Sequence, residues 1–201
     1  MTASPRAVGP ILFALIGVGC VLFGLRSAEV RAAAARPLTA EERAAATKTT
    51  AGAFSADAEQ SFRFELPAPD GPTDLLCGEL DAQPAFALLR GDRVLAMAPM
   101  TDGQRLSLYG GCSGVSMADL NNDGKLDVIV TANVCAGANC VANNFTLAAV
   151  LLASPSGYRQ AKAWTTAVPY SVVEGGIRSI RTYAKSRPVT LSAAEAKAAG
   201  N

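Results

Sequence analysis

The chain has 201 residues, a formal net charge of +1 and a charged fraction of 17%, so it has no strong net field that would attract nucleic acid or acidic lipid. It contains no histidine, the side chain best suited to acid–base catalysis near neutral pH and the commonest transition-metal ligand. The length suits one globular domain with appendages, and most hydrolase and zinc mechanisms are disfavoured.

An apolar segment lies near the N-terminus. Residues 7–25 carry no charge, and residues 11–25 are dense in Leu, Ile, Val and Phe, which is typical of a membrane-spanning helix. A cleaved signal peptide is the alternative, because small residues follow the segment. A lipoprotein site at Cys20 is a third possibility, although the usual Leu three positions before the cysteine is missing. We predict an uncleaved anchor over residues 1–26.

The segment that follows, residues 27–61, is rich in Ala, Thr and Ser and is predicted to be a stalk with one short helix. Thr39 and Glu42 form a capping box that would start this helix. A second box, Ser192 with Glu195, predicts a short helix in the C-terminal tail, residues 188–201.

Between these ends, the exported domain is predicted over residues 62–187. Short apolar or alternating runs separated by turn residues predict strands. The predicted strands cover residues 62–66, 85–90, 93–97, 104–109, 126–132, 145–153 and 158–164, with one or two more within 171–183. The predicted fold is mainly β, a small antiparallel sheet or sandwich with an N-terminal transmembrane helix and short flanking helices. A complete propeller is not expected, because no internal repeat is present.

The cysteines predict disulfides. Cys20 lies in the apolar segment, and the other four lie in the body of the chain. An even number of cysteines in an exported domain suggests two bonds, and three connectivities are possible. We predict Cys135–Cys140, which closes a short loop, and Cys77–Cys112. Four buried free thiols are the alternative.

Residues 119–127 form the motif with the clearest chemistry. Side-chain oxygens occur at positions 1, 3, 5 and 9 of a loop with glycine at position 6, so alternate residues can point to one centre. These side chains belong to Asp119, Asn121, Asp123 and Asp127, and the backbone carbonyl of Lys125 can add another oxygen. Such a hard oxygen set suits Ca²⁺. The alternative is a hairpin turn without metal.

The surroundings of this loop point to a particular family. An EF-hand would place a Glu at position 12, where this chain has Val130, and the loop leads into a β-branched run and not into a helix. Residues 117–132 resemble the FG-GAP repeat, also called VCBS, and residues 144–158 resemble that repeat's next strand and turn. The resemblance implies a loop that joins two strands and binds calcium through the five residues named above, Lys125 through its backbone.

Two weaker motifs have plainer interpretations. Residues 110–114 have the form of a nucleophile elbow around Cys112, but without histidine no base is evident, so a glycine-rich turn holding a half-cystine is favoured. A basic run could meet an acidic partner or lipid headgroups, although a solvated face is the simpler interpretation. The basic run consists of Arg178, Arg181, Lys185 and Arg187.

Together these features predict a non-catalytic, membrane-anchored, calcium-binding protein that mediates protein contact, as an accessory subunit of a membrane complex. Paired cysteines and a calcium loop suit an oxidising, calcium-rich compartment outside the cytoplasm, the periplasm in a bacterium. One alternative is a secreted or surface module for adhesion or glycan binding. Another is a carboxylate-based hydrolase or lyase using Asp70, Asp74 or Glu174. No nucleic-acid partner is expected.

Overall fold

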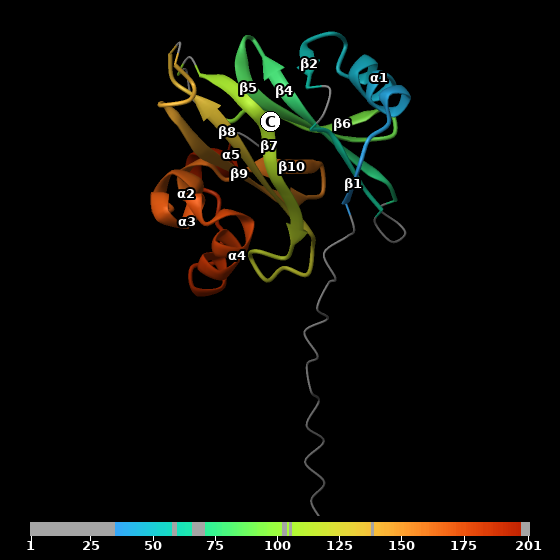
Figure 1. Cartoon of the computed structure of the whole chain (residues 1–201). Coiled ribbons are helices and arrows are strands. Elements are labelled where there is room, and N and C mark those ends of the chain that lie inside the picture. The colour runs from blue at the N-terminus through green and yellow to red at the C-terminus, as the bar shows by residue number, and fades with distance from the viewer. Residues whose placement is uncertain are drawn as a thin grey trace, which may run out of the picture.

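The computed structural model describes residues 35–57, 60–65, 71–101, 104, 106–137 and 139–197. Two antiparallel sheets form its centre, and helices cover their outer sides (Figure 1). The fold is therefore mainly β, as the sequence predicts.

The first sheet has six strands, and the second has four. In the first, the order is β1-β3-β4-β5-β6, and β2 also pairs with β4. Its strands are β1 (Ala35–Pro37), β2 (Phe54–Ala56), β3 (Phe62–Phe64), β4 (Thr73–Leu80), β5 (Gln83–Arg90) and β6 (Arg93–Pro99). The second sheet has the order β10-β9-β8-β7. Its strands are β7 (Ser107–Ala118), β8 (Asp127–Cys135), β9 (Asn144–Ser154) and β10 (Gly157–Gln160).

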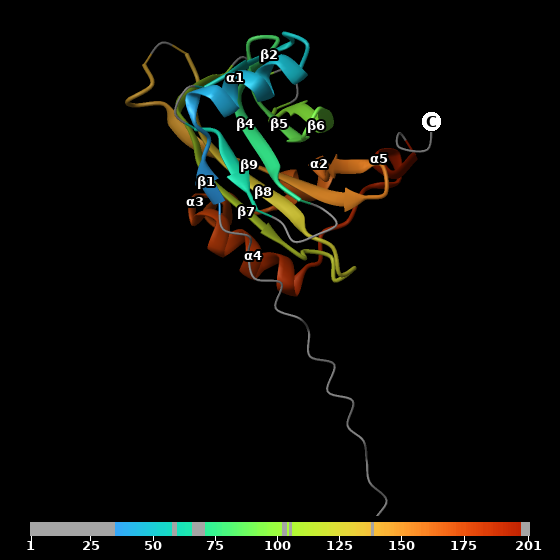
Figure 2. The same cartoon turned by 90° about the vertical axis from the view of Figure 1, so that its right-hand side faces the viewer.

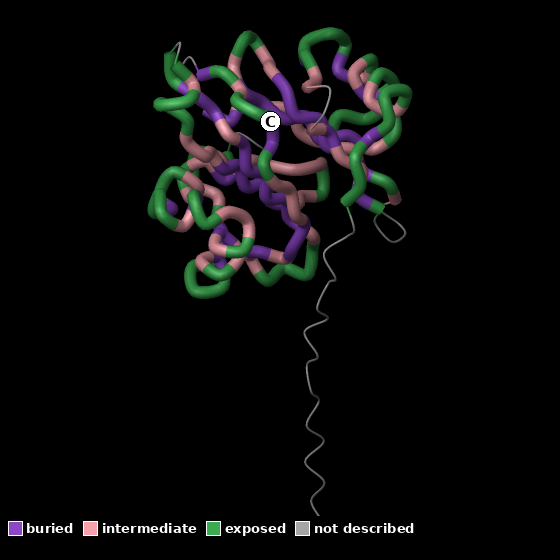
Figure 3. The backbone as a smooth tube through the Cα atoms, viewed as in Figure 1, coloured by how far each residue is buried: buried purple, intermediate pink, exposed green. Residues whose placement is uncertain are grey.

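The main core lies between the two sheets, and buried backbone is concentrated in the strands (Figure 3). Because side chains alternate across a strand, β5 turns Phe86 and Leu88 into this core and Ala87 toward the helix on the other side. The second sheet alternates in the same way, with Val128 and Val130 inward and Ile129 outward. Each sheet is therefore covered on both faces, by the other sheet on the inside and by helices on the outside.

The helix α1 (Ala40–Thr49) covers the outer face of the first sheet. The predicted capping box is present, with Thr39 Oγ1 accepting from the Glu42 amide and Glu42 accepting from the Thr39 amide. Arg63 on β3 joins this helix to the sheet, because it bonds Glu42 at 2.6 Å and Asp74 on β4 at 2.6 and 2.8 Å. The described residues of the predicted stalk, 35–57 and 60–61, therefore belong to the β domain, because they supply β1, α1 and β2.

Four C-terminal helices follow the second sheet, and the first three cover its outer face, on the side away from α1 (Figures 1 and 2). They are α2 (Lys162–Ala167), α3 (Tyr170–Glu174), α4 (Gly176–Ser186) and α5 (Ala193–Lys197). The second capping box forms between Ser192 and Glu195, and Glu195 also accepts from the Ala163 amide at the start of α2. The C-terminal helix is thus docked on the domain.

The strand predictions within residues 158–164 and 171–183 are wrong beyond Gln160. The buried residues Val173, Ile180 and Ala184, with Ile177 packed beside them, follow the helical spacing of three and four residues. Trp164 lies in α2 and packs edge-to-face on Tyr183, with ring centroids 5.8 Å apart. Residues 162–186 form helices because helical spacing places their apolar side chains on the outer face of the second sheet.

Two strands extend beyond the predictions. No strand was predicted over β4, although it is a central strand whose Leu75, Leu76 and Cys77 are completely buried. The strand predicted over 104–109 instead runs from residue 107 to 118. Gly110 and Gly111 have φ values of 82° and 70°, and the register shifts between Leu108 and Cys112, so the expected glycine-rich turn is a bulge within β7.

Two disulfides, Cys77–Cys112 and Cys135–Cys140, are the pairs that the sequence predicts. The first joins β4 to β7, and therefore one sheet to the other. The second closes the hairpin between β8 and β9. Cys20 and the predicted membrane-spanning segment, residues 11–25, lie outside the described residues. Within the described part of the chain, no helix is long and apolar enough to cross a membrane.

Candidate metal centre

The segment that carries the metal motif forms the connection between β7 and β8. These strands are antiparallel neighbours, and Ala118 pairs with Asp127 at the end of the hairpin next to the loop. Asn122 and Gly124 have φ values of 63° and 81°, the left-handed conformation that Asn and Gly tolerate best. The motif is thus a tight loop between two strands.

The oxygens of the first three candidate ligands turn toward the loop's own amides. Asp119 accepts from the amides of Asp123 and Gly124 at 3.2 and 3.0 Å. The Asn121 side-chain oxygen accepts from the same Asp123 amide at 3.1 Å, and Asp123 accepts from the Lys125 amide at 2.9 Å. The loop's own amides therefore fix these three oxygen-bearing side chains in place.

Asp127 is anchored differently, because it lies at the first position of β8 and is completely buried. One carboxyl oxygen accepts from the Leu120 amide at 2.9 Å, and the other accepts from the Ala153 amide at 2.8 Å. Burial, together with the nearby charges of Asp123 and Asp119, raises its pKa to about 6, although the two hydrogen bonds lower it. Asp127 thus ties the loop to β9 and lies within the electrostatic reach of the other two carboxylates.

The chemistry of these residues fits a hard divalent cation. Three carboxylates and an amide oxygen are typical calcium ligands, and an ionised carboxylate that accepts one hydrogen bond per oxygen keeps further lone pairs. Their proximity costs energy, since Asp119 and Asp123 disfavour the charged form of Asp127, and a bound cation would relieve this repulsion. Among the described residues, no three His, Cys, Asp or Glu side chains already converge as a metal-binding group.

The other candidate chemistry does not come together. Cys112 is bonded to Cys77 and buried, so it is no nucleophile. Asp74 is paired with Arg63 in the first sheet, whereas Glu174 ends α3 on the far side of the second sheet. Asp70 lies outside the described residues.

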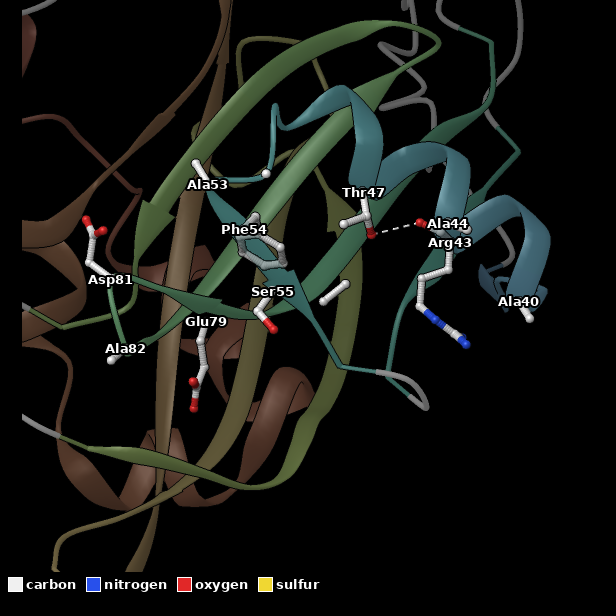
Figure 4. Close-up of a pocket in the computed structure, with 12 residues that line it drawn as sticks. Ala40, Arg43, Ala44, Thr47, Ala53, Phe54, Ser55, Glu79, Asp81 and Ala82 are labelled. Atoms are coloured by element: carbon white, nitrogen blue, oxygen red, sulfur yellow. Dashed lines mark hydrogen bonds between the residues drawn. The ribbon is translucent and has the colours of Figure 1, made fainter.

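Figure 4 shows a groove of about 770 Å³ between α1 and the edge formed by β2 and β4. Small residues line much of it. The charged side chains of Arg43, Glu79 and Asp81 point in different directions, so the groove does not assemble a catalytic pair.

Three residues of the basic run, Arg178, Arg181 and Lys185, lie on α4, and Arg187 follows that helix. The Arg187 guanidinium lies 5.6 Å from the Tyr183 ring centroid, and its carbonyl accepts from the Trp164 indole at 3.1 Å. Arg187 therefore has a local packing role, while the other three remain on the helix that faces the loop. The sequence alone did not place this helix beside the metal motif.

The fold and the loop together define a two-sheet β protein in which an aspartate-rich loop joins adjacent antiparallel strands. Residues 69–130 match the family model of the FG-GAP-like repeat. The chain therefore carries an FG-GAP-like repeat, in one copy, over less than a third of its length. The match includes the loop and the start of β8, whereas residues 144–158 lie outside it. No curated protein and no solved structure gives a significant match.

Proposed function

We propose that this protein is a non-catalytic, calcium-binding interaction module, tethered to a membrane and facing a compartment outside the cytoplasm. The observation that carries the proposal is the FG-GAP-like repeat with its aspartate-rich loop between β7 and β8, because such repeats suggest modules for protein interaction or adhesion. The calcium ion would hold the loop through Asp119, Asn121, Asp123, Asp127 and the Lys125 carbonyl, without taking part in any reaction.

The proposed location rests on the cysteines and the N-terminal composition. Two disulfides brace the domain, and disulfides persist in oxidising compartments. The apolar residues 11–25 would supply the tether. A small domain on a single tether has a function only through what it contacts, so we further propose that it is an accessory subunit of a membrane complex.

Calcium is expected to stabilise the full-length oxidised chain in detergent. For an ion that binds only the folded state, a hundredfold excess over the dissociation constant contributes about 2.7 kcal/mol. Thermal unfolding with added calcium and with chelator measures the shift. The shift is expected to disappear in Asp123→Ala, since this change removes a proposed ligand that is exposed and whose carboxylate accepts from the Lys125 amide within the loop.

Equal unfolding temperatures with calcium and with chelator would reduce residues 119–127 to a plain turn and overturn the calcium part of the proposal. Magnesium at the same concentration is the control ion, because its smaller octahedral shell suits this loop less well.

The partner is expected to co-purify with the protein in stoichiometric amount after mild detergent extraction. Purification from the native membrane, followed by quantification of the associated chains, tests this. A monodisperse monomer would overturn the subunit proposal. Recovery of the chain in the soluble fraction would instead favour a released adhesion or glycan-binding module.

A further inference from the structure

The calcium loop and the basic helix α4 face one another across a small cavity. This cavity has a volume of about 50 Å³, and Asp119 and Asn122 of the loop line it together with Arg181 and Lys185 of α4. The first candidate ligand of the loop therefore lies next to two cationic side chains that are far from it in sequence.

The helix is fixed in this position by the core beneath it. Leu120 of the loop shares a hydrophobic cluster with Ile180 and Ala184 of α4. After the helix, the Val189 amide donates to the Leu120 carbonyl at 3.2 Å. Since the loop and the helix are packed against each other, Arg181 and Lys185 cannot move away as a unit when an ion enters the loop.

The two cations face the loop without neutralising it directly. Among the described residues, neither Arg181 nor Lys185 forms a salt bridge. Arg181 is half-buried, and Lys185 is exposed. Their charges thus act on the loop through space, across the cavity.

From this geometry we propose that Arg181 and Lys185 are affinity-determining residues of the calcium loop, which lower its affinity by repelling the bound divalent cation. The inference rests on the proposed function and deepens it. A loop weakened in this way would respond to the higher calcium concentrations outside the cytoplasm, where modules bind with dissociation constants of roughly 10⁻⁴ to 10⁻³ M.

Replacing either cation by neutral glutamine is expected to tighten calcium binding. A unit charge a few ångströms beyond the ligands repels a divalent ion enough to change its affinity by about threefold to tenfold per charge at low salt. The measurement is the calcium dissociation constant of the full-length oxidised chain in detergent, by titration calorimetry, for wild type, Arg181→Gln and Lys185→Gln.

Three controls separate charge from packing. Arg178→Gln removes the same charge from the same helix but does not line the cavity, so it is expected to change the affinity less than either test variant. Arg181→Lys keeps the charge and is expected to retain wild-type affinity. In 1 M salt, where the screening length is only about 3 Å, the gain in the glutamine variants is expected to vanish.

The outcomes also separate the inference from the proposed function. A wild-type chain that binds no calcium would overturn both. Wild-type binding with unchanged or weakened affinity in Arg181→Gln and Lys185→Gln would overturn this inference alone, and so would a gain in affinity that persists in 1 M salt.

Discussion

Replacement of Asp127 by alanine is expected to lower the free energy of unfolding by about 3 kcal/mol in the presence of chelator, because a buried N–H left without a partner costs about 1–3 kcal/mol. Asp127 is completely buried and accepts from the amides of Leu120 and Ala153. Alanine removes both acceptors, and only part of this loss is offset by removing a buried carboxylate. Denaturant unfolding with chelator measures the change.

The matched variants distinguish this anchoring role from metal binding. Asp127→Asn keeps one carbonyl oxygen, so it is expected to lose less stability than Asp127→Ala. Asp123→Ala removes an exposed carboxylate of the same loop and is expected to cost less than about 1 kcal/mol in chelator. Equal stabilities of Asp127→Ala and Asp123→Ala in chelator would contradict the anchoring role.

The same carboxyl group gives stability a pH dependence. Its pKa is about 6 in the folded chain against a reference value of 3.8, so between these values the folded state binds the proton more tightly than the unfolded state. The stabilisation is complete below pH 3.8 and is lost as the pH rises through 6, by at most about 3 kcal/mol. In chelator, this component is expected to be missing from Asp127→Asn, and parallel pH profiles of the two proteins would contradict it.

Loss of the Cys77–Cys112 disulfide is expected to cost about 4 kcal/mol from loop-closure entropy alone. The bond spans 35 residues, joins β4 of one sheet to β7 of the other, and is buried in the main core. The double variant Cys77→Ala with Cys112→Ala avoids an unpaired thiol. Its free energy of unfolding, compared with that of the oxidised wild type, measures the effect.

The second disulfide is the internal control. Cys135–Cys140 spans only 5 residues, so the corresponding double alanine variant is expected to lose about 2 kcal/mol. A larger loss in this variant than in the Cys77 and Cys112 pair would show that local hairpin geometry, and not the connection between the sheets, dominates stability.

Apart from the Cys77–Cys112 pair, which the sequence also predicted, the features that the sequence by itself determined are local. Each capping box needs only two residues three positions apart, Thr39 with Glu42 and Ser192 with Glu195, and both form as predicted. The loop depends on a fixed spacing of oxygens and a glycine within residues 119–127, and the FG-GAP-like match contains it. Interactions that close within a few residues are encoded by spacing and backbone conformation alone.

The tertiary structure decided what joins distant residues. Whether an apolar run such as residues 171–183 becomes strand or helix depends on the surface that it covers, and here the second sheet offers a face that α3 and α4 fill. The central strand β4 was missed because it is buried on both faces and so does not alternate, while Asp74, Gly78 and Glu79 leave it only a short apolar run. The link from Asp127 to Ala153 and the cavity between the loop and Arg181 also needed the folded chain. Contacts of this kind join residues tens of positions apart and depend on which surfaces pack together, so local spacing does not predict them.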